Sequence, residues 1–490
     1  MMRCFYSIMI AGTLFLTGSL EAKAAFGPDE WLEYRLKDDN NAVYQNEGTK
    51  PLEPRIFETE DEVRSTPVVA DNKIFIGNHN TGGLFAYDVL SGDLLWETKL
   101  PNWIHSEAIY HDNTVYVGFG NRFYQKNNGI RGTGESGVMA LDAETGEIKW
   151  KANTKGEVMP TPVYHDGFVY AASGDRNLHK IDAESGKTVK EIELESVVSM
   201  SSPNLYEGNI FLGGSVPYSF YSVDLSKEQR AWERGIPEAV AGLDDVPPAI
   251  HNDIAVTTAL DQKEPVPLRE VYENFGAIQV YEEIVKSAVG QLLDKERMSY
   301  YEHMIYALDT ESGEIVWKDS LGTGTIVKNN KSGAPMIYDG KVFLGSPITK
   351  QFYAYDLENG DELWKFENEV IKAPPVAADG IVYFSNAKGY VHAMDAGTGE
   401  EIGRKKLGGT LAPSGPIIIN DTLFIGSQDS NVYALPTENI RSAADEYHKE
   451  PPVERSAAGY IFTVYVLPIV IVLSALGVLA FYFMRRKRSI

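Results

Sequence analysis

Short apolar runs alternate with turn residues over most of the chain. Between Ser65 and Lys99, runs of Val, Ile, Phe and Tyr are broken at Asp71-Asn72, at residues 78–83 and at Ser91-Gly92. Apolar runs of this length between turn signals predict four successive β-strands. A lone four-stranded meander leaves a face uncovered, so the pattern predicts copies of this unit that stack on one another.

The end of this unit carries a phrase that recurs along the chain. "YALDTESGEIVWK", which begins at Tyr306, has close copies that begin at Phe85, Met139 and Tyr353. In each copy an Asp precedes a Trp by eight positions. The same column holds, in chain order, Trp96, Trp150, Lys190, Trp232, Trp317, Trp364 and Gly403. A four-stranded unit of about 40 residues is typical of a propeller blade, and an open solenoid is the alternative.

The two ends of the repeat region favour a closed ring. The last unit begins at Ser414, supplies three strands and stops at Pro436. The segment "RIFETED", residues 55–61, matches the missing fourth strand, with Phe57 in the Trp position. A strand from one end that completes a unit at the other closes a ring. The sequence therefore predicts an all-β fold, an eight-bladed β-propeller with four-stranded blades over residues 55–435.

The segments outside the repeats predict a membrane topology. Residues 1–24 have the basic start, apolar run and small-residue end of a signal peptide, and residues 25–54 form a lead-in. A polar stalk, residues 436–456, leads to an uncharged apolar run, residues 457–484, which is long enough for one transmembrane helix. The basic tail, residues 485–490, is expected to stay in the cytoplasm. We therefore expect a single-pass protein of the cytoplasmic membrane, with the propeller outside and the C-terminus inside.

The pattern Ala-x-Asp-x-x-Thr/Ser-Gly-x-x-x-Trp resembles the pyrroloquinoline-quinone-like (PQQ-like) repeat. In that family the Trp docks between neighbouring blades, so the resemblance implies docking roles for Phe57, Trp96, Trp150, Trp232, Trp317 and Trp364. Lys190 and Gly403 depart from the pattern, and blades three and seven are expected to be held differently. The family includes quinoprotein dehydrogenases and the scaffold lipoprotein of outer-membrane protein assembly. The resemblance thus predicts architecture and leaves function open.

Charge and cysteine content exclude several functions. The formal net charge is −24; the signal contributes +1 and the tail +4, which leaves −29 for the rest. Such a surface repels phosphate backbones, so no nucleic-acid partner is expected. The only cysteine, Cys4, lies in the predicted signal, which excludes thiol chemistry and cysteine metal sites from the mature chain. No nucleophile, metal or dinucleotide motif stands in a suitable context, so no catalytic or metal-ligating residue is predicted.

Three insertions interrupt the repeat. They are residues 121–135, about 262–301, which has helical spacing, and 320–332. Because successive strands alternate in direction, all three are expected on one face, together with the mouth of the central channel. Charged residues near the starts of the innermost strands are candidate ligand-binding residues: Arg64, His105, Glu107, Asp244, Asp245, Lys331 and Lys372. Trp103 is a candidate aromatic platform. A water-filled channel and rim packing are the alternatives.

These observations favour a membrane-anchored, extracytoplasmic binding or assembly platform. Its partner would be a protein or a small ligand that binds the inserted face. The C-terminal helix would anchor the protein in the membrane. The alternative is a PQQ-dependent oxidoreductase of the cell envelope. The resemblance implies that such an enzyme carries an adjacent cysteine pair at the quinone, with acidic calcium ligands. The cysteine pair is missing, so no cofactor is expected, and PQQ with calcium remains the alternative.

Overall fold

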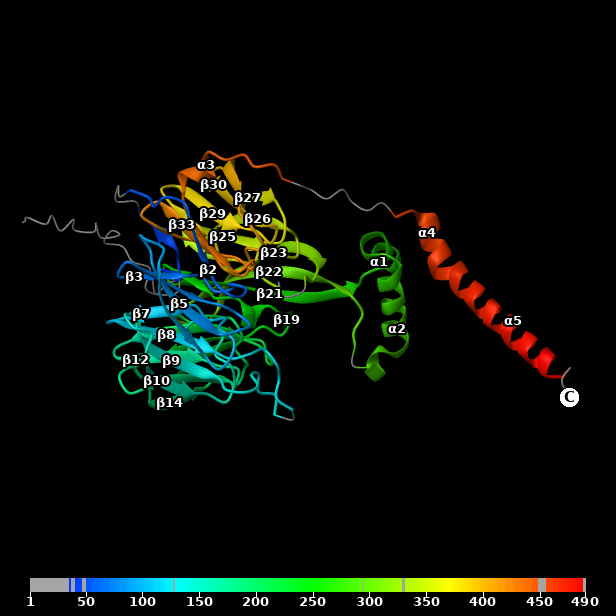
Figure 1. The fold of residues 1–490 in the computed structure, drawn as a ribbon, viewed down its shortest axis with the longest axis horizontal. Helices are drawn as coiled ribbons and strands as arrows, with labels where there is room; N and C mark the ends of the chain where they lie inside the picture. Colours follow the sequence, from blue (N-terminus) through cyan, green and yellow to red (C-terminus); the bar gives the residue numbers. More distant parts are fainter. Residues whose placement is uncertain are drawn as a thin grey trace, which may run out of the picture.

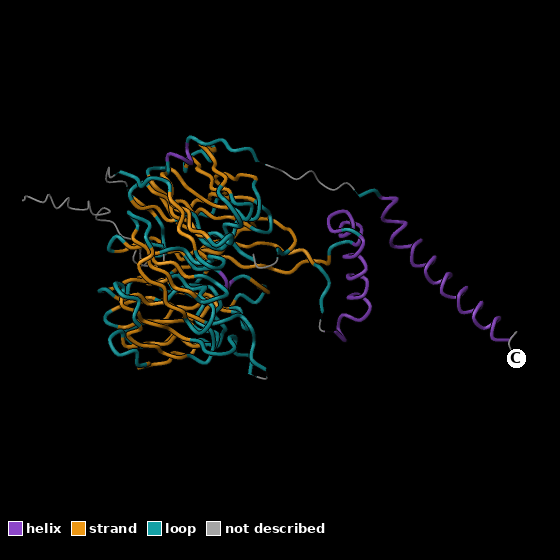
Figure 2. The backbone as a smooth tube through the Cα atoms, in the orientation of Figure 1, coloured by secondary structure: helices purple, strands orange, loops and turns teal. Residues whose placement is uncertain are grey.

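Eight β-sheets make up most of the molecule, and the longer helices lie to one side of them (Figures 1 and 2). The computed structural model describes residues 35–36, 40–45, 50–126, 128–293, 295–327, 331–447 and 455–487. The predicted signal peptide, most of the lead-in and parts of the predicted stalk and tail lie outside these residues. The eight-bladed propeller with four-stranded blades is confirmed, because each sheet contains four strands in meander order.

The strands follow one another blade by blade. Blades one and two contain β3 (Val68–Ala70), β4 (Lys73–Gly77), β5 (Gly83–Asp88), β6 (Leu94–Lys99), β7 (Ala108–His111), β8 (Thr114–Phe119), β9 (Gly137–Asp142) and β10 (Ile148–Asn153). Blades three and four contain β11 (Val163–His165), β12 (Phe168–Ala172), β13 (Asn177–Asp182), β14 (Thr188–Glu193), β15 (Asn204–Tyr206), β16 (Asn209–Gly214), β17 (Ser219–Asp224) and β18 (Gln229–Gly235).

The second half repeats this order with additions. Blades five and six contain β20 (Ala249–His251), β21 (Ile254–Pro265), β22 (Ser299–Asp309), β23 (Ile315–Thr325), β24 (Met336–Tyr338), β25 (Lys341–Ser346), β26 (Gln351–Asp356) and β27 (Glu362–Glu367), with β19 (Ala239–Ala241) and the short helix η1 (Leu243–Asp245) before them. Blades seven and eight contain β28 (Val376–Ala378), β29 (Ile381–Ser385), β30 (Tyr390–Asp395), β31 (Glu401–Lys406), β32 (Ile417–Ile419), β33 (Thr422–Gly426), β34 (Asn431–Pro436) and β2 (Arg55–Glu58).

Strand β2 closes the ring. It pairs antiparallel with β34, the last strand of the repeat region, although more than 370 residues separate the paired positions in the chain. In this register Arg55 lies opposite Ala434 and Phe57 lies opposite Val432. Ring closure removes the open sheet edges that an incomplete last blade would leave.

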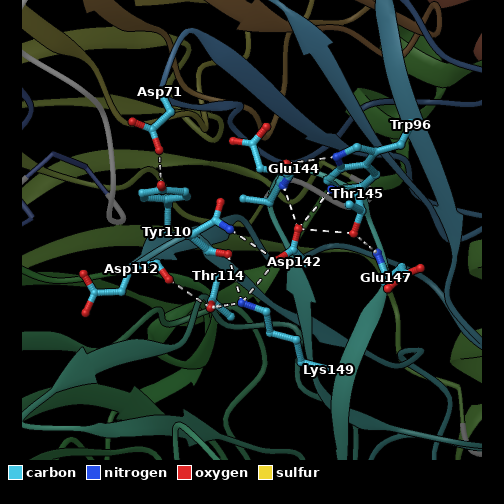
Figure 3. Close-up of polar contacts among 12 residues, drawn as sticks. Asp71, Trp96, Tyr110, Asp112, Thr114, Asp142, Glu144, Thr145, Glu147 and Lys149 are labelled. Atoms are coloured by element: carbon cyan, nitrogen blue, oxygen red, sulfur yellow. Dashed lines mark hydrogen bonds and ion pairs between the residues drawn. The ribbon is translucent and has the colours of Figure 1, made fainter.

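The recurring phrase joins one blade to the next (Figure 3). At the turn after β9, the Asp142 carboxylate accepts hydrogen bonds from the backbone N–H groups of Glu144 and Thr145, at 3.0 and 3.1 Å. Gly146 follows with φ +71°. The indole of Trp96, from the preceding blade, donates a 3.0 Å hydrogen bond to the carbonyl of Ala143. A Cβ on Gly146 would lie 2.6 Å from the Trp96 ring, so this position needs glycine both for its backbone angle and for close approach.

The other tryptophans of the column repeat this contact. Each indole donates to a turn carbonyl of the next blade, and each ring covers the turn glycine: Trp150 to Ala183 (2.9 Å), Trp232 to Thr310 (2.9 Å), Trp317 to Leu357 (2.8 Å) and Trp364 to Ala396 (3.4 Å). The phrase therefore builds a chain of blade-to-blade contacts around most of the ring.

The closing strand departs from the prediction. In blade one the Trp column residue, Trp96, lies opposite Ala86 on the third strand. The residue that matches Ala86 in blade eight is Ala434, and Arg55 lies opposite it, so Arg55 and not Phe57 is in the Trp column. Arg55 donates to the carbonyls of Leu90 and Ser91 in blade one, which is the role of the indole elsewhere. Phe57 is buried two positions away and packs on Tyr87, with ring centroids 5.5 Å apart.

Blades three and seven use other contacts in place of the tryptophan. Lys190 is exposed, and Lys180 on the neighbouring strand forms a 2.7 Å ion pair with Glu228 in the next blade. At Gly403 the missing side chain leaves room for the short helix α3 (Glu438–Arg441), whose Ile440 is fully buried. Residues 436–447 therefore pack on the propeller, and the first half of the predicted stalk, 436–456, is not a free linker.

The lead-in contributes an unpredicted strand. Strand β1 (Val43–Tyr44) pairs parallel with β28, the innermost strand of blade seven. Beside it, the Asn41 side chain donates a 2.7 Å hydrogen bond to the carbonyl of Ile250 and accepts one of 2.7 Å from the N–H of Ile337. The Tyr44 hydroxyl accepts a 2.7 Å hydrogen bond from the N–H of Asn420. This segment thus crosses the inner strands of blades five to eight and plugs one end of the channel.

The largest insertion is a long hairpin capped by two helices. Strands β21 and β22 extend beyond the other blades and carry α1 (Leu268–Phe275) and α2 (Ala277–Leu293) at their tip (Figure 1). After the predicted stalk, α4 (Ala457–Ile461), a π-helical segment η2 (Phe462–Val466) and α5 (Leu467–Lys487) form one helical rod. Residues 457–481 of this rod are long and apolar enough to cross a membrane, and the most apolar stretch of 18 residues within them contains no buried residue.

We expect Trp96→Ala to lower the free energy of unfolding by about 3–5 kcal/mol, because it removes a buried ring and its hydrogen bond to the next blade. Lys190→Ala is the matched control, since Lys190 occupies the same column but is exposed, and we expect a change within about 0.5 kcal/mol. Urea unfolding followed by tryptophan fluorescence measures both. Equal losses in the two variants would show that the column does not hold the blades together.

Candidate functional site: a cationic funnel in the channel

The inner strands surround a funnel at the unplugged end of the channel. Its wider part has a volume of about 420 Å³ and continues into an inner part of about 40 Å³. Five cationic side chains and one carboxylate line the wider part: Arg64, Arg122, Arg131, Lys331, Lys372 and Asp245. The lead-in segment that plugs the channel lies directly beyond the inner part. Pro374 lines that part, and the carbonyl of the next residue, Pro375, accepts a hydrogen bond from Arg35 of the lead-in. The funnel thus opens at one end.

The funnel residues come from two kinds of segment. Arg64, His105 and Lys372 stand just before the innermost strands of blades one, two and seven, and Asp245 ends η1. These segments approach the axis in every blade, so their side chains converge although they are far apart in the chain. The remaining cations belong to insertions: Arg122 and Arg131 to residues 121–135, and Lys331 to residues 320–332.

Six of the eight predicted mouth residues line the funnel, namely Arg64, His105, Glu107, Asp245, Lys331 and Lys372. Asp244 does not. Its backbone carbonyl accepts hydrogen bonds from the N–H groups of Met200 and Ser201, and its carboxylate accepts one of 2.9 Å from Ser215. Asp244 therefore holds the loop between blades three and four.

Trp103 does not line the funnel either. Its ring packs between His79, at 4.7 Å between centroids, and Phe123, at 5.3 Å. The rim-packing alternative describes this position, and no platform for a flat ligand forms there. His79, which does line the funnel, was not predicted, and neither were Arg122 and Arg131. The insertion that carries the two arginines was singled out, so its basic residues were the available signal.

Three ion pairs hold funnel cations in place. Lys372 pairs with Asp245 at 2.7 Å, and both side chains are largely buried. Arg131 pairs with Glu157 at 2.7 Å, behind the funnel wall. Arg64 pairs with Glu62 at 2.8 Å. Lys331, by contrast, makes no ion pair with a described residue.

Burial shifts the titration of the neighbouring acids and imidazoles. Desolvation raises the pKa of Glu107 to about 7, despite a hydrogen bond from Thr66. Desolvation also raises the pKa of Glu157 to about 8, because it outweighs the attraction of Arg131. It lowers the pKa of His79 to about 4, with the charge of Arg64 acting in the same direction, and it holds the pKa of His105 well below its usual value. At neutral pH the raised pKa values leave the carboxyls of Glu107 and Glu157 at least half protonated, so these two groups offset the neighbouring cations only in part.

The funnel residues do not fit a quinone held by calcium. The described residues contain no group of three or more His, Cys, Asp or Glu side chains that could hold a metal ion. The charged lining is cationic, whereas calcium prefers several carboxylate and carbonyl oxygens. Trp103 is packed into the rim, and among the described residues no Trp, Tyr or Phe lines the cavity.

Comparison with known proteins decides the family. Residues 117–283 and 304–443 match the family described as "Outer membrane protein assembly factor BamB". The chain belongs to this family. The resemblance to PQQ-like repeats drawn from the sequence is thereby confirmed.

Relatives of this BamB-family chain have different functions. A tetrathionate hydrolase from Acidithiobacillus ferrooxidans is 24% identical over 396 residues, which cover 76% of this chain and 72% of the relative. The BamB of Shewanella oneidensis is 23% identical over 382 residues, 76% of this chain and 85% of the relative.

Solved structures share the fold at lower identity. The crystal structure of BamB from Moraxella catarrhalis has a TM-score of 0.55 at 15% identity and covers 78% of this chain and 98% of that one. Quinohemoprotein alcohol dehydrogenase from Comamonas testosteroni has a TM-score of 0.55 at 12% identity and covers 89% and 85%. These likenesses support the propeller fold alone.

We expect Glu107 to make the protein less stable as the pH rises from about 4.5 to about 7. In this window the buried carboxyl keeps its proton, whereas the unfolded chain has lost it, so unfolding releases a proton. The pKa difference corresponds to a loss of about 3 kcal/mol across the window, with no further loss above pH 7. Glu107→Gln should abolish this part of the pH dependence of the melting temperature.

Glu184→Gln serves as the control for this prediction, because Glu184 lies in an exposed turn. It should keep the wild-type pH profile. A Glu107→Gln profile that parallels the wild type between pH 5 and 7 would show that Glu107 is ionised in the folded protein.

Proposed function

We propose that this protein is a membrane-anchored, extracytoplasmic β-propeller that binds a small divalent oxyanion in its central funnel and a protein partner at the funnel's rim. The observation that carries the proposal is the lining of the funnel. Five cations and one carboxylate face a cavity in a chain whose net charge is −24. In an acidic protein, a wall of this composition is a specific arrangement of charge.

The size and charge of the funnel support a small anionic ligand. Its volume of about 420 Å³ lies within the usual range for small-molecule sites. A cleft lined by one sign of charge between low-dielectric walls focuses the field and raises the local concentration of opposite charge. Arginine and lysine together offer both planar and compact donors to oxyanions. A divalent oxyanion would neutralise part of this charge at little desolvation cost to the already paired residues.

One relative supports the chemical class. Tetrathionate, which gives the Acidithiobacillus relative its name, is a sulfur oxyanion with two negative charges. The BamB relatives are named for assembly, which supports the second half of the proposal, a protein partner. The oxidoreductase alternative has no support in the funnel, because its residues do not fit the quinone and calcium.

The rim of the funnel offers a surface for the partner. Phe123 and Tyr124, in the insertion of blade two, are 53% and 55% exposed beside the mouth. Adjacent exposed aromatic side chains are enriched at protein–protein interfaces, where they act as anchors. Neither residue belongs to a strand of blade two, because β8 ends at Phe119 and β9 begins at Gly137.

The C-terminal rod supports the proposed anchoring. Its apolar span is long enough to cross a bilayer, and Arg485, Arg486, Lys487 and Arg488 follow in the sequence. Basic flanks favour the cytoplasmic side, which supports an orientation with the propeller outside.

Isothermal titration calorimetry of the full-length protein in detergent tests the funnel. We expect sulfate or tetrathionate to bind, and choline, a cation, to give no heat of binding. Lys331→Gln should weaken dianion binding about tenfold or more, because it removes a charge-assisted contact without breaking an ion pair between described residues. Lys187→Gln, in an exposed turn, is the control and should leave the Kd unchanged. Equal affinity in both variants, or no binding of either dianion, would contradict a funnel site.

Photo-cross-linking in intact membranes tests the rim. A photoreactive residue placed at position 128, beside the aromatic pair, should give a discrete cross-linked band. We expect the band to be lost on Phe123→Ala with Tyr124→Ala, while the melting temperature stays within a few degrees of the wild type. Exchange of two exposed apolar residues elsewhere, Leu94→Ala and Leu95→Ala on β6, should leave the band. Its persistence without the aromatic pair would place the partner elsewhere.

A further inference from the structure

The helical insertion is fastened to the start of the C-terminal rod. The rings of Tyr272 in α1 and Tyr460 in α4 lie 5.8 Å apart, edge to face. The Arg455 guanidinium donates a 2.8 Å hydrogen bond to the carbonyl of Glu273. The hydroxyl of Tyr281 in α2 donates to the carbonyl of Thr463. Both helices of the insertion, drawn in green in Figure 1, thus contact the rod within its first turns.

These contacts occur at a definite height on the rod. A bilayer core of about 30 Å requires about 20 helical residues. Counting back from Arg485, where the charged tail begins, puts the outer edge of the hydrocarbon near Tyr465. Tyr460 and Thr463 then lie in the outer headgroup region. The insertion is therefore held at the level of the membrane surface.

The face of α2 around Tyr281 is apolar and exposed. Ile278, Tyr281 and Val285 follow one another at spacings of three and four residues, so they lie on one side of the helix. Ile278 is 86% exposed and Val285 is 51% exposed. Tyr281, between them, contacts the rod. The stripe thus continues sideways from the apolar rod at the height of the headgroups.

The packing of the insertion does not need this stripe. Its interior is formed by Val266, Val271 and Val280. The buried carboxylate of Glu283 accepts a 2.6 Å hydrogen bond from the N–H of Met298 and pairs with Lys286 at 2.9 Å, which ties α2 to the base of the hairpin. The two helices are thus held from their other side, and Ile278 and Val285 project from the folded unit.

Tyrosine residues cluster at the same height on the rod. Tyr465 lies 6.1 Å from Tyr460, and Tyr460 in turn contacts Tyr272. Tyrosines are enriched where a protein meets the membrane–water interface, since one end of the ring is apolar and the hydroxyl is polar. An amphipathic helix with an apolar stripe at this depth lies in the interface plane.

We propose that α1 and α2 form a membrane-resting collar, in which Ile278 and Val285 enter the outer leaflet beside the C-terminal rod. The lipid surface is the occupant of the exposed stripe, because the stripe continues the apolar surface of the rod at headgroup depth. The proposal rests on the membrane anchoring proposed above. Its consequence is an orientation: the collar grows from the face of the propeller that carries the other insertions, so the funnel mouth is turned toward the membrane.

Site-specific fluorescence in the full-length protein tests the collar. Because Cys4 is the only cysteine, the variant Cys4→Ser accepts single labels without interference. Ile278→Cys, Val285→Cys, Leu473→Cys in the rod and Glu184→Cys on a turn of the opposite propeller face are each labelled with bimane. The proteins are placed in phosphatidylcholine nanodiscs that contain headgroup spin-labelled lipid. We expect labels at 278 and 285 to lose most of their fluorescence to this lipid, and the label at 184 to be quenched only by aqueous iodide.

The label at Leu473 separates the two proposals. It should be quenched by lipid spin-labelled deep in the acyl chain. If it is quenched while 278 and 285 respond to iodide alone, the anchor stands and the collar is overturned. If 278 is shielded from both quenchers, a protein surface covers the stripe, and the collar proposal is likewise overturned. If Leu473 itself responds only to iodide, the rod does not span the bilayer, and both proposals fall.

Discussion

The packing of one indole ring on one turn glycine holds this structure together. A four-stranded blade has two faces to cover. The neighbouring blade covers one of them only if the two blades approach closely at their outer strands. The Trp96 ring on Gly146, with its hydrogen bond to Ala143, provides that approach. The ring of blades depends on repeating it. Where the tryptophan is missing, other groups take its place: Arg55 at the closing strand, and helix α3 over Gly403.

Ring closure also creates the site. Each innermost strand begins near the axis, so side chains from distant parts of the chain share one small volume. Lys372 and Asp245 are 127 residues apart, yet their charges lie 2.7 Å from one another. Burial in the wall removes water from nearby carboxyl groups and disfavours their charged form, which raises the pKa of Glu107 and of Glu157. Residue identity thus supplies the cations of the cavity, and burial weakens the charge of these two nearby carboxyls.

The two ends of the chain add to the propeller in complementary ways. The lead-in plugs one end of the channel through Asn41 and Tyr44, whereas the opposite end opens among the insertions. The C-terminal rod meets the insertion of blade five through Tyr460 and Thr463. The open end of the funnel and the helices α1 and α2 thus belong to one face. The proposed ligand site, partner surface and anchor are thus combined on a scaffold whose repeats encode none of them.

The period of the sequence determined the number of blades, the order of strands and the closure of the ring, because Asp, Gly and Trp at fixed spacing leave few ways to pack. It also indicated which residues start the inner strands, and six of the eight candidates meet in the funnel. Tertiary structure decided the rest. Arg55 and Phe57 lie on the same side of their strand, so only the register with β34 shows which residue takes the place of the tryptophan. Asp244 and Asp245 are neighbours, but the turn of η1 directs one carboxylate to Ser215 and the other to Lys372. The plug, too, depends on hydrogen bonds to four distant blades, which no local pattern in the lead-in contains.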